Sequence, residues 1–181
     1  MRFLPALVLA GCGYLGSARP FNPAHPPPGM DLLAQIEPVR QGVENDCGPA
    51  ALTMVLRWHE DPLTLEEAVK ALPPREGGGV TAGALRDFAR ARGFRAHVVA
   101  GTFDDLRKQI ALGRPLVVGL IKPYISKLVP HFEVLAGIDP EAKCVVTVDP
   151  ARGWMRNSFD GFLLEWDASG RVTLIVAPAP Q

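Results

Sequence analysis

The change from helix-forming to strand-forming patterns near Gly113 is the feature that most restricts how this chain can fold. Before that point, segments with apolar residues three and four positions apart end at glycine or proline. After it, short apolar runs separated by turn residues predict strands at residues 116–121, 131–138, 144–149 and 172–177. Helices followed by strands, without regular alternation, favour an α+β layer architecture over a parallel α/β sheet.

The helices of the first half have recognisable start residues. Thr64 and Glu67 form a capping-box pattern ahead of a short helix, and Thr81 and Thr102 begin two others. An earlier helix is expected over residues 50–59, after N-cap and first-turn residue types. A strand is expected at residues 94–99. In the second half, the polar turn at residues 139–143 predicts an antiparallel hairpin between the strands on either side of it.

Residues 1–11 are predicted to be an export signal that does not belong to the folded domain. Arg2 is a minimal basic region, Phe3 to Ala10 form a short apolar core, and the sequence LAGC that ends at Cys12 resembles a bacterial lipobox. The apolar stretch is too short to span a bilayer. We therefore expect a mature protein that begins at Cys12 and carries lipid on that thiol. Such a protein would be anchored to an envelope membrane and face the periplasm or the exterior.

The remainder divides into a tether at residues 12–30 and one domain at residues 31–181. Five prolines between Pro20 and Pro28 block helix and ladder formation, which predicts an extended, semi-rigid spacer. Acidic and basic residues are equal in number, 19 each, and no basic stripe occurs, so nucleic acid is not an expected partner. The sequence does not indicate an oligomeric state.

Cys47 stands at the start of the first expected helix, in the stretch QGVENDCGPAA at residues 41–51. At the positive end of a helix, unpaired backbone N–H groups favour a thiolate over a thiol, and the thiolate is the nucleophilic form of cysteine. The alternative is a small buried hydrophobe, because free cysteines are among the most buried residues. Partners elsewhere in the chain decide between these two interpretations.

His131 and Asp149 are the best-placed partners for such a thiolate. A cysteine peptidase needs an imidazole to pair with the thiolate and protonate the leaving amine, and a third group to orient the imidazole. His131 follows a predicted loop at residues 122–130 and opens a strand, whereas Asp149 ends the next strand. Antiparallel pairing therefore brings both to one end of the sheet. Asp149 as a simple strand-ending residue before Pro150 stays an open alternative.

Gln41 is the candidate for the remaining part of the site. Its side-chain amide and the backbone N–H of Cys47 could donate hydrogen bonds to the oxyanion of an acyl transfer. The other three histidines receive no catalytic role. His59 ends a helix and His97 lies within a strand, where structural roles are expected, and His25 lies in the Pro-rich segment.

The candidate residues belong to short motifs in a fixed order: Gln41, DCGPA at 46–50, PHFEVL at 130–135, VDP at 148–150, and Gly153. In this order the motifs resemble the bacteriocin-processing, double-glycine leader cysteine peptidases of the papain-like superfamily. The resemblance covers residues 36–177 and implies a papain-like α+β fold, with an N-terminal helical part packed on a C-terminal antiparallel sheet. It also implies roles: nucleophile for Cys47, general base and acid for His131, orienting group for Asp149, and oxyanion donor for Gln41.

The expected location differs from that of the best-known members of that family, which are cytoplasmic domains of peptide-exporting ABC transporters. Behind a lipoprotein signal, this domain would meet a peptide or protein substrate outside the cytoplasm. The residue set favours a cysteine peptidase, or an acyl transferase that uses the same intermediate. The alternative is a catalytically inactive peptide-binding module of the same fold, acting in envelope assembly or export.

No cofactor or metal is expected, because neither a His-Glu-x-x-His pattern nor a paired-cysteine spacing occurs. A disulfide between Cys47 and Cys144 would block the nucleophile. Cys144 lies five residues before Asp149 on one strand, roughly 16 Å away at about 3.3 Å per residue. If Asp149 lies near Cys47, Cys144 is therefore too far from Cys47 to form this bridge. Bridged Cα atoms lie within about 7 Å of each other. We therefore expect both thiols to be unpaired and Cys144 to be buried.

Overall fold

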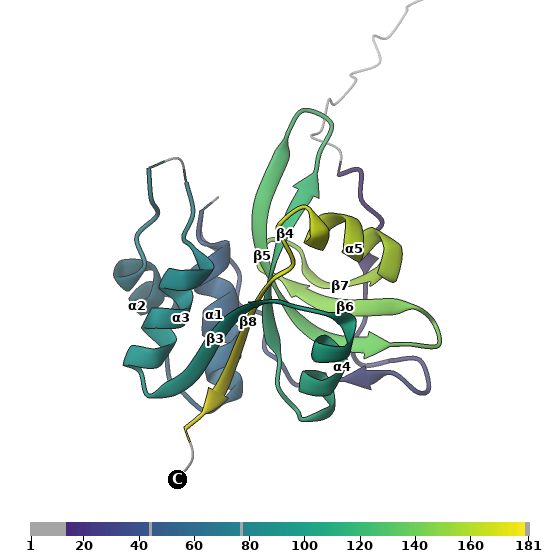
Figure 1. Ribbon diagram of the computed structural model, residues 1–181, viewed down its shortest axis with the longest axis horizontal. Coiled ribbons are helices and arrows are strands. Elements are labelled where there is room, and N and C mark those ends of the chain that lie inside the picture. Colours follow the sequence, from purple (N-terminus) through teal and green to yellow (C-terminus); the bar gives the residue numbers. More distant parts are fainter. Residues whose placement is uncertain (1–13, 44, 77, 180–181) are drawn as a thin grey trace, which may run out of the picture.

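The computed structural model describes residues 14–43, 45–76 and 78–179 and shows an antiparallel sheet with helices on both faces (Figure 1). The helices are α1 (Cys47–Trp58), α2 (Leu65–Ala71), α3 (Ala82–Ala91), α4 (Phe103–Ala111) and α5 (Phe159–Asp167). The strands are β1 (Arg19–Pro20), β2 (Asp31–Leu32), β3 (Phe94–Ala100), β4 (Leu116–Pro123), β5 (Leu128–Asp139), β6 (Cys144–Asp149), β7 (Gly153–Ser158) and β8 (Val172–Pro178). The sheet order is β1-β7-β6-β5-β4-β8-β3, and β2 pairs with β5. The predicted α+β architecture is confirmed.

The helix starts agree closely with the sequence. Thr64, Thr81 and Thr102 are N-caps whose side chains accept a hydrogen bond from the backbone three residues on, and capping boxes are complete at the first and last of them. α1 begins at Cys47, three residues earlier than expected. Asp46 occupies its N-cap position, but its side chain makes no cap hydrogen bond.

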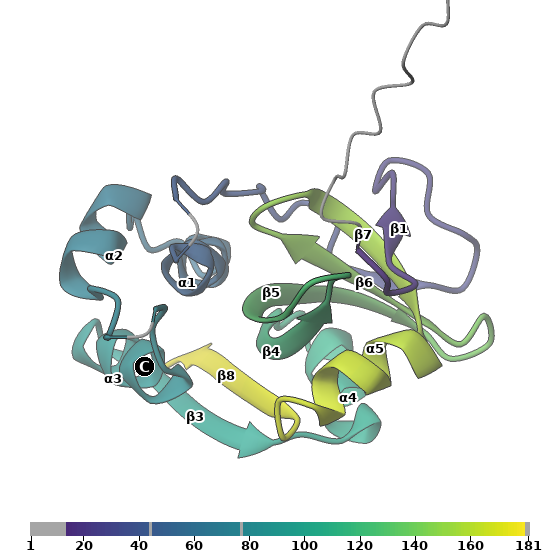
Figure 2. The ribbon, with the colours of Figure 1, turned by 90° about the horizontal axis from the view of Figure 1, so that it is seen from above.

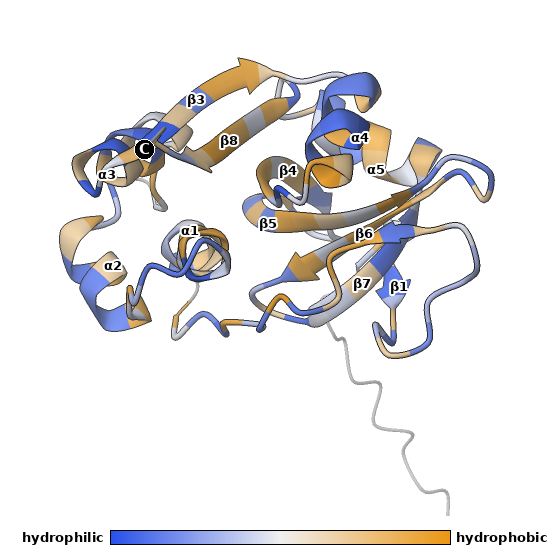
Figure 3. Cartoon of the chain, turned by 90° about the horizontal axis from the view of Figure 1, so that it is seen from below, coloured by the Kyte–Doolittle hydropathy of each residue, from blue (hydrophilic) through white to orange (hydrophobic). Residues whose placement is uncertain are grey.

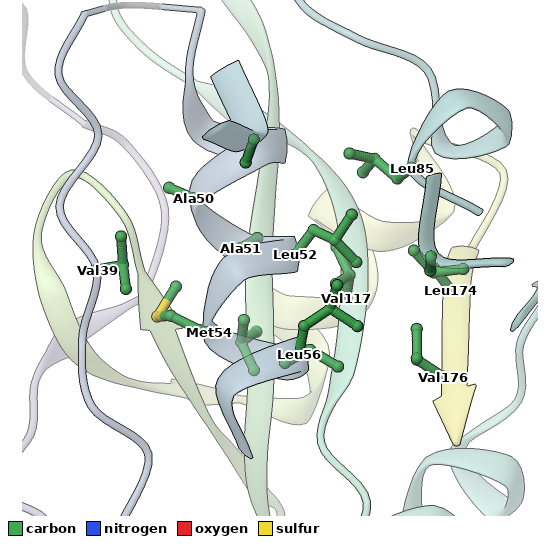
Figure 4. Close-up of a cluster of buried hydrophobic side chains, with 14 of the residues drawn as sticks. Val39, Ala50, Ala51, Leu52, Met54, Leu56, Leu85, Val117, Leu174 and Val176 are labelled. Carbon is green, nitrogen blue, oxygen red and sulfur yellow. The ribbon is translucent and has the colours of Figure 1, made fainter. Parts of the chain in front are cut away.

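Two hydrophobic clusters hold the helices on opposite faces of the sheet (Figures 2 and 3). The side chains of β4 contribute alternately to the two clusters, because successive residues of a strand point to opposite faces of the sheet. Val117 joins the cluster under α1, whereas Leu116 and Val118 join the cluster under α4 and α5. In Figure 4, Leu52 and Leu56 of α1 point toward Val117 and the side chains of β8. The α1 cluster thereby fixes the helix that carries Cys47 against the sheet.

The β4–β5 hairpin is longer than the sequence suggested. Residues 122–130 were expected to form a loop, but the ladder continues to the pair Pro123 and Leu128, so only four residues form the turn. β6 pairs with β5 only from Val134 onward. Pro130 is tolerated because no neighbouring strand needs its missing N–H on the other side. The predicted loop is therefore wrong, and His131 lies inside a strand that projects beyond the end of β6.

Residues 14–21 lie against the sheet. Tyr14 forms a β-bridge with Tyr124 in the turn of the β4–β5 hairpin, and the N–H of Leu15 donates to the carbonyl of Pro123 at 2.9 Å. β1 then pairs with β7 as an edge strand. The backbone groups of β7 on that side are thereby partly paired, as an exposed sheet edge requires.

This packing differs from the predicted tether at residues 12–30. The part that packs on the sheet comes before most of the prolines: Arg19 and Pro20 pair with β7, and the backbone N–H groups of Leu15 and Phe21 donate to carbonyls of the sheet. The predicted signal peptide and Cys12 lie outside the described residues. Within the described part of the chain, no helix is both long and apolar enough to cross a membrane.

Candidate active site

Cys47 is the first residue of α1 and is 6% exposed. Its backbone N–H belongs to the first helical turn, where N–H groups have no partner within the helix. The next residue, Gly48, allows a close approach, because a Cβ there would overlap the side chain of Val80 and press against Phe132. The glycine after the cysteine therefore lets the helix start lie directly against β5.

His131 and Asp149 are joined by a hydrogen bond of 2.8 Å between Nε2 and Oδ1. The register of the hairpin explains the meeting. Val134 lies opposite Val148, so Asp149 ends β6 beside the part of β5 that projects beyond it. Asp149 is 1% exposed. The sequence prediction that antiparallel pairing would bring these two residues together at one end of the sheet is confirmed.

The imidazole of His131 also hydrogen-bonds to Cys47, so the ring bridges the thiol and the carboxylate. Burial alone would lower the pKa of His131. The hydrogen bonds with Asp149 and Cys47, together with the carboxylate charge, outweigh that effect and raise the pKa to about 10. For Asp149, burial acts to raise the pKa, but its hydrogen bonds and the nearby charges hold it well below the usual range. At neutral pH the pair is an imidazolium and a carboxylate.

Arg152 is a member of this cluster that sequence reasoning missed. Its Nε donates to Oδ2 of Asp149 at 2.7 Å, while Oδ1 accepts from His131 and from the N–H of Ala151 at 2.8 Å. Both carboxylate oxygens are thus occupied. A sequence signal was present in Glu133, a charged residue inside the apolar run HFEVLAGI, because a buried charge in a strand requires a partner of opposite charge.

Gln41 lies close to this end of the sheet, because its backbone N–H donates to the carbonyl of Pro150 at 3.1 Å. Its side-chain Nε2 donates to the carbonyl of Val43 at 3.0 Å. This bond uses one of the two N–H donors of the side-chain amide. Its role as an oxyanion donor therefore stays a prediction.

The other cysteine and histidines in the described residues lie away from the cluster. Cys47 and Cys144 are both free and both buried, as expected. His59 is half-buried at the end of α1, where burial lowers its pKa, and a backbone hydrogen bond ties it to β8. His97 is exposed on β3, and His25 is exposed and hydrogen-bonded to Asn22.

Two clefts flank the bridge between Cys47 and His131. One, of about 460 Å³, reaches Cys47 and is walled by the segment before α3 and by the outer part of β5. The other, of about 360 Å³, reaches His131. The two share a wall made of Val80, Pro130 and Phe132. A larger depression of about 570 Å³ lies beside Met54 and Trp58 of α1 and does not include Cys47. An extended peptide could therefore pass the thiol with side chains in both flanking clefts.

One group of possible metal ligands occurs in the described residues: His131, Glu133 and Asp149, with ligand atoms within 4.8 Å of one another. Both carboxylates already have cationic partners. Lys122 lies 2.6 Å from Glu133, and Arg152 lies 2.7 Å from Asp149. A divalent ion would have to displace these two cations, so the arrangement fits a proton-transfer site better than a metal centre.

Comparison with known proteins gives the family. Residues 35–181 match the peptidase C39 family. The peptidase domain of Streptococcus ComA, a bifunctional ABC transporter of a quorum-sensing pathway, has a TM-score of 0.67 at 23% identity, covering 80% of this chain and all of that domain. A C39-like peptidase from Bacillus anthracis has a TM-score of 0.67 at 17% identity, covering 84% of this chain and 99% of that one.

A third solved structure is a double-glycine motif protease from an AMS/PCAT transporter, in complex with its leader peptide. It has a TM-score of 0.65 at 22% identity and covers 80% of this chain and 93% of that one. A comparison with curated protein sequences gave no match. Because the family match extends over most of the sequence and the solved structures share the fold, this chain belongs to the peptidase C39 family of cysteine peptidases.

Proposed function

We propose that Cys47, His131 and Asp149 form the catalytic site of this peptidase and that its substrate is a peptide or protein precursor. The observation that carries the proposal is the bridging position of the His131 ring, which hydrogen-bonds to the thiol and to a buried carboxylate at once. This is the arrangement of nucleophile, base and orienting group that acyl transfer requires.

In the proposed reaction the proton of the Cys47 thiol resides on the ring of His131. The thiolate sulfur attacks the carbonyl carbon of the scissile bond and forms a tetrahedral oxyanion. The imidazolium then gives its proton to the leaving amine as the C–N bond breaks, which leaves a thioester on Cys47. His131 next removes a proton from water, the resulting hydroxide attacks the thioester, and the acid product leaves as the thiolate is restored. Asp149 holds the ring in one orientation throughout.

The oxyanion would lie at the N-terminus of α1. There the backbone N–H of Cys47 and the helix dipole favour negative charge. Gln41 would add a hydrogen bond from its side-chain amide. We expect Gln41→Ala to lower kcat by about a hundredfold with little change in KM, because such donors act in the transition state.

Alkylation by iodoacetamide tests the site without a known substrate. At pH 6, where an ordinary thiol is almost fully protonated, we expect Cys47 to react at least tenfold faster than in a His131→Ala variant. Modification at each cysteine is read by mass spectrometry. A rate at Cys47 that does not depend on His131 would contradict the catalytic proposal and favour a binding module.

Cleavage is tested with a synthetic leader peptide that ends in a double glycine, because that motif names the solved relative bound to its leader peptide. Cys47→Ala is the matched control, since it keeps the cleft and removes the sulfur. Cleavage by the native chain alone supports the peptidase proposal. Binding of the peptide by both proteins without cleavage would favour the binding module for this substrate.

We further propose that the chain is a lipoprotein anchored through Cys12. The motif LAGC at residues 9–12 supports this proposal. Only Gly13 separates Cys12 from Tyr14, which already contacts the sheet. An anchor at Cys12 would therefore hold the domain close to the membrane surface, on its periplasmic or outer side. Radiolabelled palmitate incorporated by the native chain, and lost in Cys12→Ser, is the expected result. Labelling of both proteins would contradict it.

A further inference from the structure

A buried group of charged side chains lies directly behind the candidate site. Lys122 is 2% exposed and extends its Nζ to within 2.6 Å of Glu133 and 2.8 Å of Glu165. The two carboxylates are 1% and 3% exposed. These groups come from β4, β5 and α5, so the network joins the projecting hairpin to the helix on the far face of the sheet. Charges this deeply buried are retained only with close partners.

Arg152 connects this network to Asp149. Its Nε lies 2.7 Å from Oδ2 of Asp149, and its Nη2 lies 3.9 Å from Glu133. The opposite carboxylate oxygen, Oδ1, carries the hydrogen bond to His131. The guanidinium therefore occupies the one oxygen that the imidazole does not use. Without it, that buried oxygen would lack its charged partner, and the carboxyl group could rotate or take up a proton.

Tyr14, from the docked N-terminal segment, completes the network from outside. Its ring centroid lies 4.4 Å from Cζ of Arg152 and 5.3 Å from Nζ of Lys122, both within cation–π range. Its hydroxyl donates a hydrogen bond to Glu165. Burial and the neighbouring carboxylate of Glu165 raise the pKa of Tyr14 to about 12, although the two nearby cations act to lower it. The hydroxyl therefore stays protonated, and a donor, from pH 5 to 9.

We propose that Arg152 and Tyr14 are positioning residues of the catalytic site. Arg152 fixes the orientation of Asp149 toward His131. Tyr14 in turn holds the guanidinium of Arg152 under its ring. Through Tyr14, the N-terminal segment thereby helps to position the catalytic residues, although the family match at residues 35–181 does not include it. This inference rests on the proposed catalytic role of Cys47.

The position of Tyr14 is secured by the rest of its segment. The N–H of Leu15 donates to the carbonyl of Pro123, and the side chain of Ser17 donates to Asn157 of β7. β1 then pairs with β7. The strand β7 begins immediately after Arg152, so the segment that carries Tyr14 pairs with the strand that follows the arginine.

The test measures the rate of Cys47 alkylation by iodoacetamide from pH 5 to 9 in the full chain. Arg152→Met removes the charge and keeps most of the volume, and Arg152→Lys keeps the charge. Tyr14→Leu removes the ring, and Tyr14→Phe keeps it. Arg171→Met is the matched control, because Arg171 also pairs with an aspartate and lies over an aromatic ring but contacts neither Asp149 nor His131. Alkylation of Cys144 and the urea midpoint report on folding.

We expect Arg152→Met to slow alkylation at pH 6 by about tenfold and to change the shape of the pH profile. Arg152→Lys should recover at least half of the native rate. Tyr14→Leu should slow the reaction by about threefold to tenfold, whereas Tyr14→Phe and Arg171→Met should behave as the native chain. A merely structural role would lower the urea midpoint without changing the pH profile of Cys47.

Native profiles in folded Arg152→Met and Tyr14→Leu, with a strong effect of His131→Ala, would overturn the positioning role and leave the catalytic proposal intact. The role of Tyr14 is also overturned if Tyr14→Phe is as slow as Tyr14→Leu, because the ring would then not be the acting group. A native profile in His131→Ala itself would instead overturn the proposed function on which the inference rests.

Discussion

The protonation of His131 predicts how the stability of this protein depends on pH. The pKa of this residue is raised from 6.5 to about 10 by Asp149 and Cys47. At about 1.4 kcal/mol per pH unit, the difference amounts to at most about 5 kcal/mol of stability. The side chain is only 11% exposed, so solvent screening removes little of it.

The direction in which stability changes with pH depends on whether the folded or the unfolded chain binds the proton of His131 more tightly. Below pH 6.5 the folded and unfolded forms both hold it, and the stabilisation is fully present. Between pH 6.5 and about 10 the unfolded chain releases this proton while the folded one keeps it, so the contribution of His131 to the free energy of unfolding falls. Above about 10 the contribution of His131 is gone. Asp149 acts in the opposite direction. Because its pKa is lowered in the folded state, it contributes stability above about pH 4 that is lost on further acidification.

Urea unfolding at intervals from pH 6 to 10, in reducing buffer, measures the effect. Cys47→Ala is compared with the Cys47→Ala, His131→Ala double variant, because the proposed site couples the proton of the thiol to His131. The difference between these two variants removes the ionisations that they share. We expect that difference to shrink by several kcal/mol over this range. Asp149→Asn should shift the decline to lower pH, because the ring loses its carboxylate partner. Parallel curves for Cys47→Ala and the double variant would refute the reasoning.

Three further predictions concern stability and are read by the same unfolding assay. Leu52→Ala should cost about 3 kcal/mol, because the side chain is fully buried between α1 and the sheet; exposed Leu112→Ala should change the free energy of unfolding by less than about 0.5 kcal/mol. Thr102→Ala should cost about 1 kcal/mol, because it removes the capping box with Asp105, and a native value would show that the cap contributes nothing. Lys122→Met should cost about 3–5 kcal/mol, since it leaves two buried carboxylates without their cation; a near-native stability would mean that they have become protonated at little cost.

The sequence predicted the elements that depend on local chemistry. Helix starts at Thr64 and Thr102 were found because their capping residues lie within one turn of each other. The fold class followed from the order of patterns, and the meeting of His131 with Asp149 followed from the hairpin between them. The helix starts and the hairpin each depend on about twenty residues or fewer, and the fold class depends only on the order of such local patterns along the chain.

What the sequence did not show depends on contacts between distant segments. The strand β7 and the helix α5 follow Gly153 without a clear period, and they are ordered by the sheet edge and by the cluster around Trp166. The predicted tether has the composition of a free spacer, yet two of its residues, Arg19 and Pro20, pair with β7. Arg152 and Lys122 look like ordinary surface charges until the fold brings them beside the buried Glu133.

The geometry of the site depends both on local sequence patterns and on contacts between distant segments. Cys47 and His131 are far apart in the chain, and the distance between them is set by how α1 packs on β5 through the cluster of buried side chains in Figure 4. The orientation of the ring is set from the other side, by Asp149 and the charges behind it. The apolar core therefore places Cys47, the proposed nucleophile, and the buried carboxylate of Asp149 holds the ring of His131. A fold that lost either one would keep the motifs in its sequence and lose the arrangement on which the proposed chemistry depends.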